Sequence, residues 1–426
     1  MITVQKLRQT ITESLALPPT APTQRDHYLS WLTKGSKTKL IKAIIGFRRS
    51  GKSYLLKMLA KNLIGQGVLA TNIFYLNFEH DFLVEIKTVL HLRQVWELYL
   101  REIASLEHPI YIIWDEIQLV GNWEKLVRTL YEQGKYNIFL SGSNSKLLSG
   151  ELSSSLAGRS LTLEIMPFRF IEYVAHEHLE FAYYSHKNEL DQAFMTYLRR
   201  GGISEQFGLP DNLANNYKDG LIKKIILDDI VKRYQIDKIN VLQEAFQFVC
   251  SNLTSTLSLR KIIGRLENSG ISVSPTTLDS YLYYWQTAYA LSRLPKFDYR
   301  LSRIFERTAK YYVVDNLLIP GRVENDEKRL ENLVYNELVY RYGRDNIFFG
   351  QDANGYEIDF VVKQDNQFLF FQVCLALTDH NAGRELGNLT LIKKYIKGKG
   401  LVLYLDDQRA NPSQDSTQPV IPWLLT

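Results

Sequence analysis

The sequence is poor in cysteine: Cys250 and Cys374 are the only two in 426 residues, and both stand in otherwise apolar runs. A fold held together by disulfide bonds is therefore not expected, and a reducing compartment fits better. No run reaches about 18 consecutive apolar residues, so we expect no membrane-spanning helix. The N-terminus also lacks the apolar core and small-residue cleavage site of a signal peptide. These absences together predict a cytoplasmic protein with no membrane partner.

An excess of either charge sign is also lacking, since 51 basic residues face 46 acidic ones and the net charge is +5. This balance excludes the strongly basic proteins that coat nucleic acid, although a local basic patch could still contact DNA. Hydrophobic residues make up 45% and charged residues 23%, which is typical of globular proteins with a sizeable core. The length indicates about two to four domains.

One motif carries clear chemistry, because Gly46, Gly51, Lys52 and Ser53 satisfy the pattern G-x-x-x-x-G-K-[ST]. A strand-like apolar run precedes the motif and a helical pattern follows it. The glycines let backbone N–H groups turn inward around phosphate oxygens, and the helix directs its positive end at the anion. We expect Lys52 to reach the β- and γ-phosphates of ATP, and the Ser53 hydroxyl to bind Mg²⁺. Three further loop residues complete the predicted nucleotide contacts: Arg49, Ser50 and Tyr54.

A pair of carboxylates, Asp115 and Glu116, follows the apolar run "YIIW". This places Asp115 at the C-terminal end of a predicted strand, where ligands bind in open α/β sheets. We expect Asp115 to hold Mg²⁺ together with Ser53. Glu116 is then placed to orient and polarise the attacking water. Lys52 and Glu116 are therefore the predicted catalytic residues.

Weaker candidates surround this pair. Ser141, Ser143 or Asn144, which end the next predicted strand, are candidates for contact with the γ-phosphate or the water, although a plain Ser/Gly turn explains them equally well. Arg159 follows a polar loop and is a candidate for stabilising transition-state charge, in cis or from a neighbouring subunit. An ordinary surface arginine is the alternative. Glu79, at the end of the second strand, is a candidate for ordering the site.

Strand and helix patterns alternate from about residue 40 to 168, which predicts an α/β fold with a parallel sheet covered on both faces. Helical periodicity then dominates to about residue 289, and near residue 331 the chain turns to a helix followed by strands. The predicted division is an N-terminal leader helix region (1–38), a P-loop ATPase domain (39–170), a helical lid region (171–245), a winged-helix-like module (246–320) and a C-terminal α/β domain (321–426).

The segments "GFRRSGKSYLL", "IIWDEIQLVGNWEKLVRTLYEQG" and "IFLSGSNSKLLSGEL" resemble AAA-superfamily ATPases of bacteria and archaea. In that family the ATPase domain is followed by domain of unknown function 4143, and "YLRRGGISEQF" and "YEIDFVV" are similar to that domain. The resemblance covers roughly residues 35 to 380. It implies an ASCE-type P-loop fold, with an extra strand between the P-loop strand and the strand that ends in Asp115. The roles of Gly46–Ser53, Asp115, Glu116 and Ser141–Asn144 carry over by position.

The segment from residue 254 to 290 has the helix, turn and helix pattern of a winged helix, and the family carries such a module here. Ser274 followed by Pro275 is a good helix start. Lys261, Arg265 and Arg293 are candidates for contact with a DNA backbone. The second helix, however, has no basic residue, which favours a helical module that packs against protein.

The tail resembles the core of restriction-endonuclease-like nucleases. That core needs a helical Glu, an Asp on one strand and a Glu/Gln-x-Lys on the next, which together hold Mg²⁺ and activate water. Glu331 or Glu337 fits the helix, Asp359 the first strand and Gln372 the second. The lysine position holds Cys374, so the sequence argues against nuclease activity and for a degenerate fold retained for binding.

The sequence therefore predicts a Mg²⁺-dependent AAA-type ATPase in which ATP hydrolysis drives conformational change of the C-terminal domains. Two alternatives stay open. One is a DNA-binding ATPase with a degenerate nuclease-like domain. The other is a nucleotide-gated switch that uses the tail to dock protein partners or a second copy of the chain.

Overall fold

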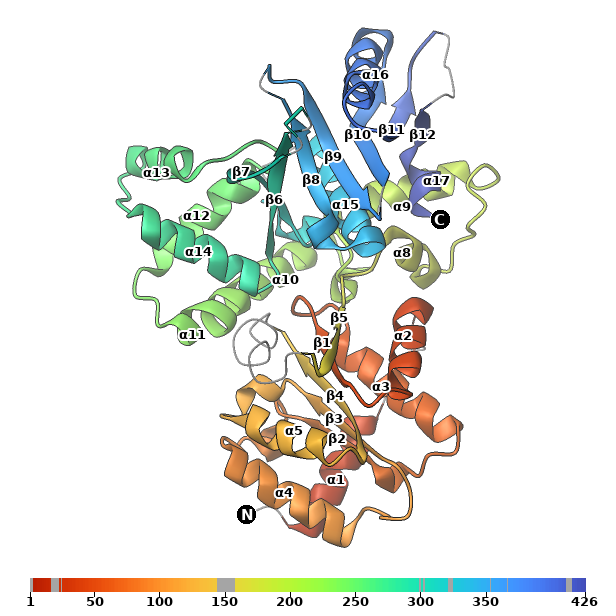
Figure 1. The fold of residues 1–426 in the computed structure, drawn as a ribbon, viewed down its shortest axis with the longest axis vertical. Helices are drawn as coiled ribbons and strands as arrows, with labels where there is room; N and C mark the ends of the chain where they lie inside the picture. Colours follow the sequence, from red (N-terminus) through yellow and green to blue (C-terminus); the bar gives the residue numbers. More distant parts are fainter. Residues whose placement is uncertain are drawn as a thin grey trace. The chain divides into compact units, whose positions relative to one another are not determined.

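In the computed structural model the chain divides into two units, Met1–Ile165 and Met166–Thr426 (Figure 1). Among the residues described below, each unit contains one β-sheet. The residues that the structure describes are 3–16, 23, 25–143, 158–298, 300–301, 303–320, 325–352, 354–365, 367–410 and 416–426.

The N-terminal unit is built on a parallel sheet of five strands in the order β2-β3-β4-β1-β5. Strand β4 pairs with β1 on one side and with β3 on the other, so the expected extra strand between the P-loop strand and the Asp115 strand is present. The predicted parallel α/β fold of this unit is confirmed. The strands are β1 (Ile41–Ile45), β2 (Ile73–Asn77), β3 (Ile110–Asp115), β4 (Tyr136–Gly142) and β5 (Ser160–Glu164).

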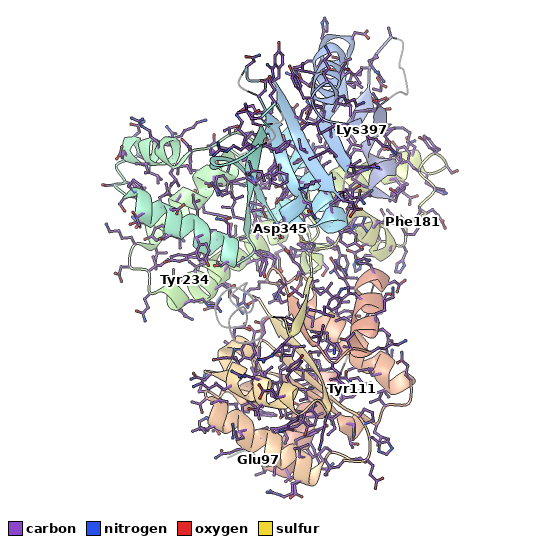
Figure 2. All side chains as sticks on the ribbon, in the orientation of Figure 1. Glu97, Tyr111, Phe181, Tyr234, Asp345 and Lys397 are labelled. Atoms are coloured by element: carbon purple, nitrogen blue, oxygen red, sulfur yellow. The ribbon has the colours of Figure 1, made fainter. Side chains whose placement is uncertain are left out.

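Amphipathic helices cover this sheet. In α4 the residues that face inward are Leu92, Val95, Trp96 and Tyr99, which recur at helical spacing, while Glu97 projects outward (Figure 2). The first helix packs on β2, so the segment expected as a leader is part of the same unit as the sheet. The helices are α1 (Val4–Leu15), α2 (Asp26–Ser36), α3 (Lys52–Gly65), α4 (Val89–Glu102) and α5 (Trp123–Glu132), with short 3-10 turns at Ala70–Asn72, Asp81–Leu83 and Ile117–Leu119.

The C-terminal unit begins with helices. Ser274 caps α14 by accepting a hydrogen bond from the Thr277 amide, and Pro275 occupies the first turn, as the sequence predicts. No helix in the described ranges is both long and apolar enough to cross a bilayer. The helices are α8 (Phe170–His176), α9 (Lys187–Arg200), α10 (Asp211–Lys224), a π-helical segment (Ile225–Val231), α11 (Lys232–Tyr234), α12 (Ile239–Ser251), α13 (Leu259–Asn268) and α14 (Pro275–Thr287), with a 3-10 turn at Ser204–Gln206.

A mixed sheet of seven strands, in the order β12-β11-β10-β9-β8-β6-β7, follows these helices (Figure 1). The hairpin β6–β7 comes directly after α14 and pairs with β8. Strands from both sides of the domain boundary that we expected after residue 320 therefore belong to one sheet. The strands are β6 (Leu291–Asp298), β7 (Arg303–Val313), β8 (Ile347–Gln351), β9 (Glu357–Gln364), β10 (Gln367–Leu377), β11 (Gly398–Asp407) and β12 (Thr417–Pro419). The helices are α15 (Asp326–Tyr342), α16 (Asp379–Lys393) and α17 (Val420–Leu424), with 3-10 turns at Asn316–Leu318 and Arg344–Asn346.

One lysine is buried in the centre of the N-terminal sheet. Lys42 of β1 has no exposed surface, its Nζ donates to the Thr38 carbonyl oxygen at 3.0 Å, and it lies 4.8 Å from the centre of the Phe139 ring. Because burial disfavours the charged form, the pKa of Lys42 falls from 10.5 to about 8. This strand therefore carries a charge that costs stability at neutral pH.

The burial of Lys42 predicts a pH dependence of stability. Between about pH 8 and 10.5 the unfolded chain binds a proton at Lys42 that the folded chain has released, so stability rises with pH. From pH 8 to 10 this residue should add about 2 kcal/mol to the free energy of unfolding. Urea titrations at both pH values should show that increment in the parent and lose it in Lys42→Met. Lys61→Met, on the exposed side of α3, should keep it.

Candidate nucleotide-binding site

The loop between β1 and α3 depends on two glycines. Gly46 has a φ of +140°, and a Cβ built on it would lie 2.2 Å from the Ile165 carbonyl oxygen, so no side chain fits there. Gly51 has a φ of +93° and occupies the position that precedes α3. Arg49 also adopts a positive φ, of 67°. The backbone therefore makes the tight turn that the motif requires.

Lys52 opens α3 and is 4% exposed. Its Nζ donates to the carbonyl oxygens of Gly46 at 3.0 Å and Phe47 at 2.9 Å, so the ammonium group lies under the loop. The Ser50 hydroxyl is buried in the same loop and has no hydrogen-bond partner among the described residues. A cation at the N-terminus of a helix, with an unsatisfied hydroxyl beside it, is an arrangement that suits an anionic ligand.

Asp115 ends β3 and has no exposed surface. One carboxylate oxygen accepts from the Ser141 hydroxyl and the other from the Tyr75 hydroxyl at 3.0 Å, and the Ser53 side chain also hydrogen-bonds to the group. Burial raises the pKa of Asp115 and the charge of Glu116 raises it further, while the three hydroxyl groups lower it. The start of α3 and the end of β3 therefore meet, as the motifs predict.

Glu116 follows in a left-handed conformation, with a φ of 54°. Its carboxylate accepts a hydrogen bond from the Ser143 amide at 3.2 Å and another from the Gln118 side chain. Its own amide donates to the Ser141 hydroxyl at 3.2 Å. Ser141 therefore contacts both acidic residues, which fixes the end of β4 against the end of β3.

Comparison with known proteins agrees with this geometry. A family model described as "AAA domain" matches residues 38–174. An uncharacterized protein of Haemophilus influenzae is 31% identical over 378 residues, which cover 88% of this chain and 91% of that protein. An uncharacterized protein of Methanocaldococcus jannaschii is 32% identical over 358 residues, which cover 81% of this chain and 77% of that protein.

The chain belongs to the same family as these two proteins, and its residues 38–174 form an AAA domain. A second model, "Domain of unknown function (DUF8612)", matches residues 191–325 of this AAA protein, where we expected domain of unknown function 4143. Among solved structures, a Walker-type ATPase of Pyrococcus abyssi has a TM-score of 0.47 and 14% identity, and the alignment covers 72% of this chain and 98% of that chain.

Arg159 lies away from the phosphate loop of this AAA unit. Its carbonyl oxygen accepts from the amide of Ile41, the first residue of β1, at 2.9 Å, and its guanidinium lies 5.9 Å from the Tyr131 ring. The loop follows the other end of β1, about 13 Å along the strand. Our expectation that Arg159 acts in cis is not supported by this position. A role at the site of a neighbouring subunit stays a prediction.

Three other candidate residues, Tyr54, Glu79 and Asn144, differ in their surroundings. The Tyr54 hydroxyl is buried without a hydrogen-bond partner in the described part of the chain, and burial raises its pKa. Glu79 forms an ion pair with Arg48 of the loop at 3.2 Å. Asn144 lies outside the residues that the structure describes.

Sequence reasoning missed Tyr75 and Gln118. Tyr75 stands in an apolar strand, where a buried tyrosine gives no sign that its hydroxyl meets Asp115. Gln118 follows the acidic pair by two positions, so its proximity to Glu116 could have been noticed.

In the C-terminal unit the structure decides between the two helical glutamates. Glu331 of α15 lies near β9, whereas Glu337 is bound by Arg169, at 2.9 Å between Nε and Oε2, and by Arg341 at 2.6 Å. The Gln372 side chain accepts from the Asp359 amide at 2.7 Å. Glu331, Asp359 and Gln372 therefore lie together, while Cys374 packs into an apolar cluster.

A lysine that sequence reasoning missed joins this cluster. Lys310 of β7 is 1% exposed, and its Nζ lies 2.8 Å from Glu357, 3.2 Å from Glu331 and 3.7 Å from Asp359. The three carboxylates line a cavity of about 1070 Å³. Lys310 is far from Gln372 in the sequence, so the spacing rule that we applied to Cys374 could not find it.

The basic residues proposed for DNA contact are exposed but stand on different elements: Lys261 and Arg265 lie on α13, and Arg293 lies on β6. The exposed residues of α14 include Thr276, Asp279 and Tyr283, and none of the helix's residues is basic.

The close contact at Gly46 predicts that Gly46→Ala disrupts the nucleotide loop. The added methyl would meet the Ile165 carbonyl at 2.2 Å on an unfavourable φ, so the backbone must move. We expect a loss of at least about 2 kcal/mol in stability and weaker ATP binding, measured by urea unfolding and nucleotide titration. Gly65→Ala, which meets nothing within 4 Å at the end of α3, should be neutral or stabilising. Parent-like stability of Gly46→Ala would contradict the geometry.

Proposed function

We propose that this protein binds ATP with Mg²⁺ at the loop Gly46–Ser53 and hydrolyses it, and that turnover changes the conformation of the C-terminal unit. The observation that carries the proposal is the hydrogen-bonded set of Ser53 and Asp115 beside Lys52. It combines an anion-binding helix start with a buried carboxylate. A triphosphate and its counter-ion need both.

The residues present fit a magnesium ion. Mg²⁺ prefers oxygen ligands and binds few protein groups, and Ser53 and Asp115 supply one hydroxyl and one carboxylate that already lie in contact. When bound, the ion neutralises the charge that develops on the β- and γ-phosphates. Lys52 supplies the second positive charge, and removal of its hydrogen bonds to the loop carbonyls would free it for phosphate.

Glu116 is the residue that we propose orients and polarises the attacking water. Its carboxylate is held by the Ser143 amide and Gln118, next to the metal-binding Asp115. A carboxylate fixed at this point can accept the proton of a water that approaches the γ-phosphate. Ser141, which contacts both acidic residues, keeps their spacing constant.

We further infer that helices α12–α14 and the hairpin β6–β7 form the winged-helix-like module expected at residues 246–320, and that this module docks protein. Helices α12, α13 and α14 precede the hairpin β6–β7, and an isolated bridge joins Leu257 to Ala309. The absence of basic residues on α14 favours a protein partner over DNA, because phosphate contact relies on positive charge. A nucleotide-gated docking surface is therefore the role that we propose for this module.

Two substitutions test the ATP site. Lys52→Ala should lose nucleotide binding, because the loop then lacks the cation that meets the phosphates. Glu116→Gln should still bind ATP but hydrolyse it about 100-fold more slowly, because an amide cannot accept the proton. Equilibrium titration with a fluorescent ATP analogue and a phosphate-release assay measure the two effects.

Lys61→Ala, on the exposed side of α3, is the matched control and should leave both measurements unchanged. Retention of nucleotide by Lys52→Ala would refute the ATP site, and parental turnover by Glu116→Gln would refute the assigned base. Hydrogen exchange in Met166–Thr426 should change on addition of ATP to the parent. Identical exchange with and without ATP would contradict the coupling.

A further inference from the structure

A buried arginine from outside the matched AAA domain contacts the phosphate loop. Arg25 precedes α2, is 4% exposed, and donates from Nη1 to the Ser50 carbonyl oxygen at 2.9 Å. Its guanidinium lies 4.6 Å from the centre of the Tyr28 ring, which fixes its orientation. The AAA family model begins at residue 38, so neither that model nor the phosphate-loop pattern includes Arg25.

Two cations therefore hold the carbonyl groups of the loop. Lys52 takes those of Gly46 and Phe47, and Arg25 takes that of Ser50. In a trans peptide the C=O and the following N–H point in opposite directions. A carbonyl held by Arg25 thus directs the N–H of Gly51 away from Arg25. A phosphate cradle needs its N–H groups inward and its carbonyl groups elsewhere.

We propose that Arg25 is a positioning residue for the triphosphate: it orients the Ser50–Gly51 peptide so that the loop presents an N–H group to phosphate. The inference rests on the proposed ATP site and adds a residue to it. The competing explanation is that Arg25 only secures α2 against α3. The two explanations differ in what they predict for nucleotide affinity at equal stability.

The test compares Arg25→Gln and Arg25→Lys with the parent. Titration with a fluorescent ADP analogue gives the dissociation constant, and thermal unfolding without nucleotide gives the stability. We expect Arg25→Gln to weaken nucleotide binding about tenfold while the nucleotide-free Tm falls little. Arg25→Lys, which keeps the charge but not the planar fork, should recover part of the affinity. Arg128→Gln, exposed on α5 and paired with Glu132, is the control and should match the parent.

The nucleotide affinity and the Tm of these variants together distinguish the two explanations for Arg25. A lower Tm for Arg25→Gln with parental nucleotide affinity would overturn the inference and leave a purely structural role. If the parent and Arg128→Gln bind nucleotide and Arg25→Gln binds it equally well, the inference fails while the proposed ATP site stands. If the parent itself does not bind nucleotide, both fail.

An independent observation in the C-terminal unit concerns the metal that a nuclease-like core would hold. Glu331, Glu357 and Asp359 converge from α15 and β9, but the Lys310 ammonium lies among them at 2.8 to 3.7 Å. A divalent ion needs several oxygen atoms at about 2.0–2.6 Å, and here the Lys310 ammonium stands at the point on which the three carboxylates converge. Within the described ranges, no group of three or more His, Cys, Asp or Glu side chains is arranged to hold a metal ion.

Further hydrogen bonds occupy carboxylate oxygen atoms in this cluster and on the neighbouring Glu385. The Tyr312 hydroxyl donates to Glu331 at 2.7 Å, the Val373 amide donates to Asp359 at 2.9 Å, and the Gln372 side chain donates to Glu385 at 2.7 Å. Burial alone would lower the pKa of Lys310, but the charges of its carboxylate neighbours raise it, so the lysine stays protonated. The residues present therefore do not fit a divalent ion.

The geometry points to Lys310 as the resident cation of this cluster, in the place where a divalent metal would otherwise bind. The cluster then needs no divalent ion to balance its carboxylates, and we expect no metal-dependent cleavage of phosphodiesters there. Removal of the lysine would leave three carboxylates without a counter-charge, so we expect them to rearrange around a divalent ion in that variant.

Electron paramagnetic resonance can measure Mn²⁺ binding to the nucleotide-free full chain and so test whether Lys310 takes the place of a metal ion. Lys310→Met should gain one Mn²⁺ site, and the double variant Lys310→Met/Asp359→Asn should lose it. Lys328→Met removes a lysine of the cavity wall and should gain no Mn²⁺ site. Should Lys310→Met fail to fold, Asp359→Asn in the parent still decides. Unchanged Mn²⁺ binding supports the inference. A Mn²⁺ site or Mn²⁺-dependent DNA cleavage that Asp359→Asn abolishes overturns it.

Discussion

The N-terminal unit depends on one constraint: Asp115 is a carboxylate with no exposed surface, and it must be satisfied where it lies. The hydroxyl groups of Ser53 in α3, Tyr75 in β2 and Ser141 in β4 form hydrogen bonds with this carboxylate. These contacts therefore fix the positions of α3, β2 and β4 relative to the end of β3. A buried polar group of this kind is costly unless it is bonded, so the same contacts that stabilise it also specify the site.

Much of this site could be predicted because its determinants are local in sequence. The loop pattern fixes Gly46, Gly51, Lys52 and Ser53, and an apolar strand followed by Asp115 gives the opposite wall. Parallel strands bring their carboxyl ends to one edge, so the two motifs meet even though β4 lies between their strands. The same rule explains why Arg159 lies far from the phosphate loop. Arg159 directly precedes β5, so it lies at the edge of the sheet where the strands begin, whereas the loop lies at the edge where they end.

What could not be predicted comes from long-range contacts. Arg25 stands before an unremarkable helix, and Lys310 stands in a strand far from the acidic residues that it neutralises. A rule based on spacing could only examine Cys374, the neighbour of Gln372 in sequence. The choice between Glu331 and Glu337 was within reach, since six residues along an α-helix place side chains about 120° apart and only one can face β9.

The pairing of β6 with β8 has a mechanical consequence. The hairpin that follows α14 is an edge of the large sheet and not a free appendage, and its second strand carries Lys310. Backbone pairing therefore links the hairpin through β8 to β9, the strand that carries Glu357 and Asp359. A displacement of this hairpin would therefore move Lys310 relative to the carboxylates of β9 that surround its ammonium group.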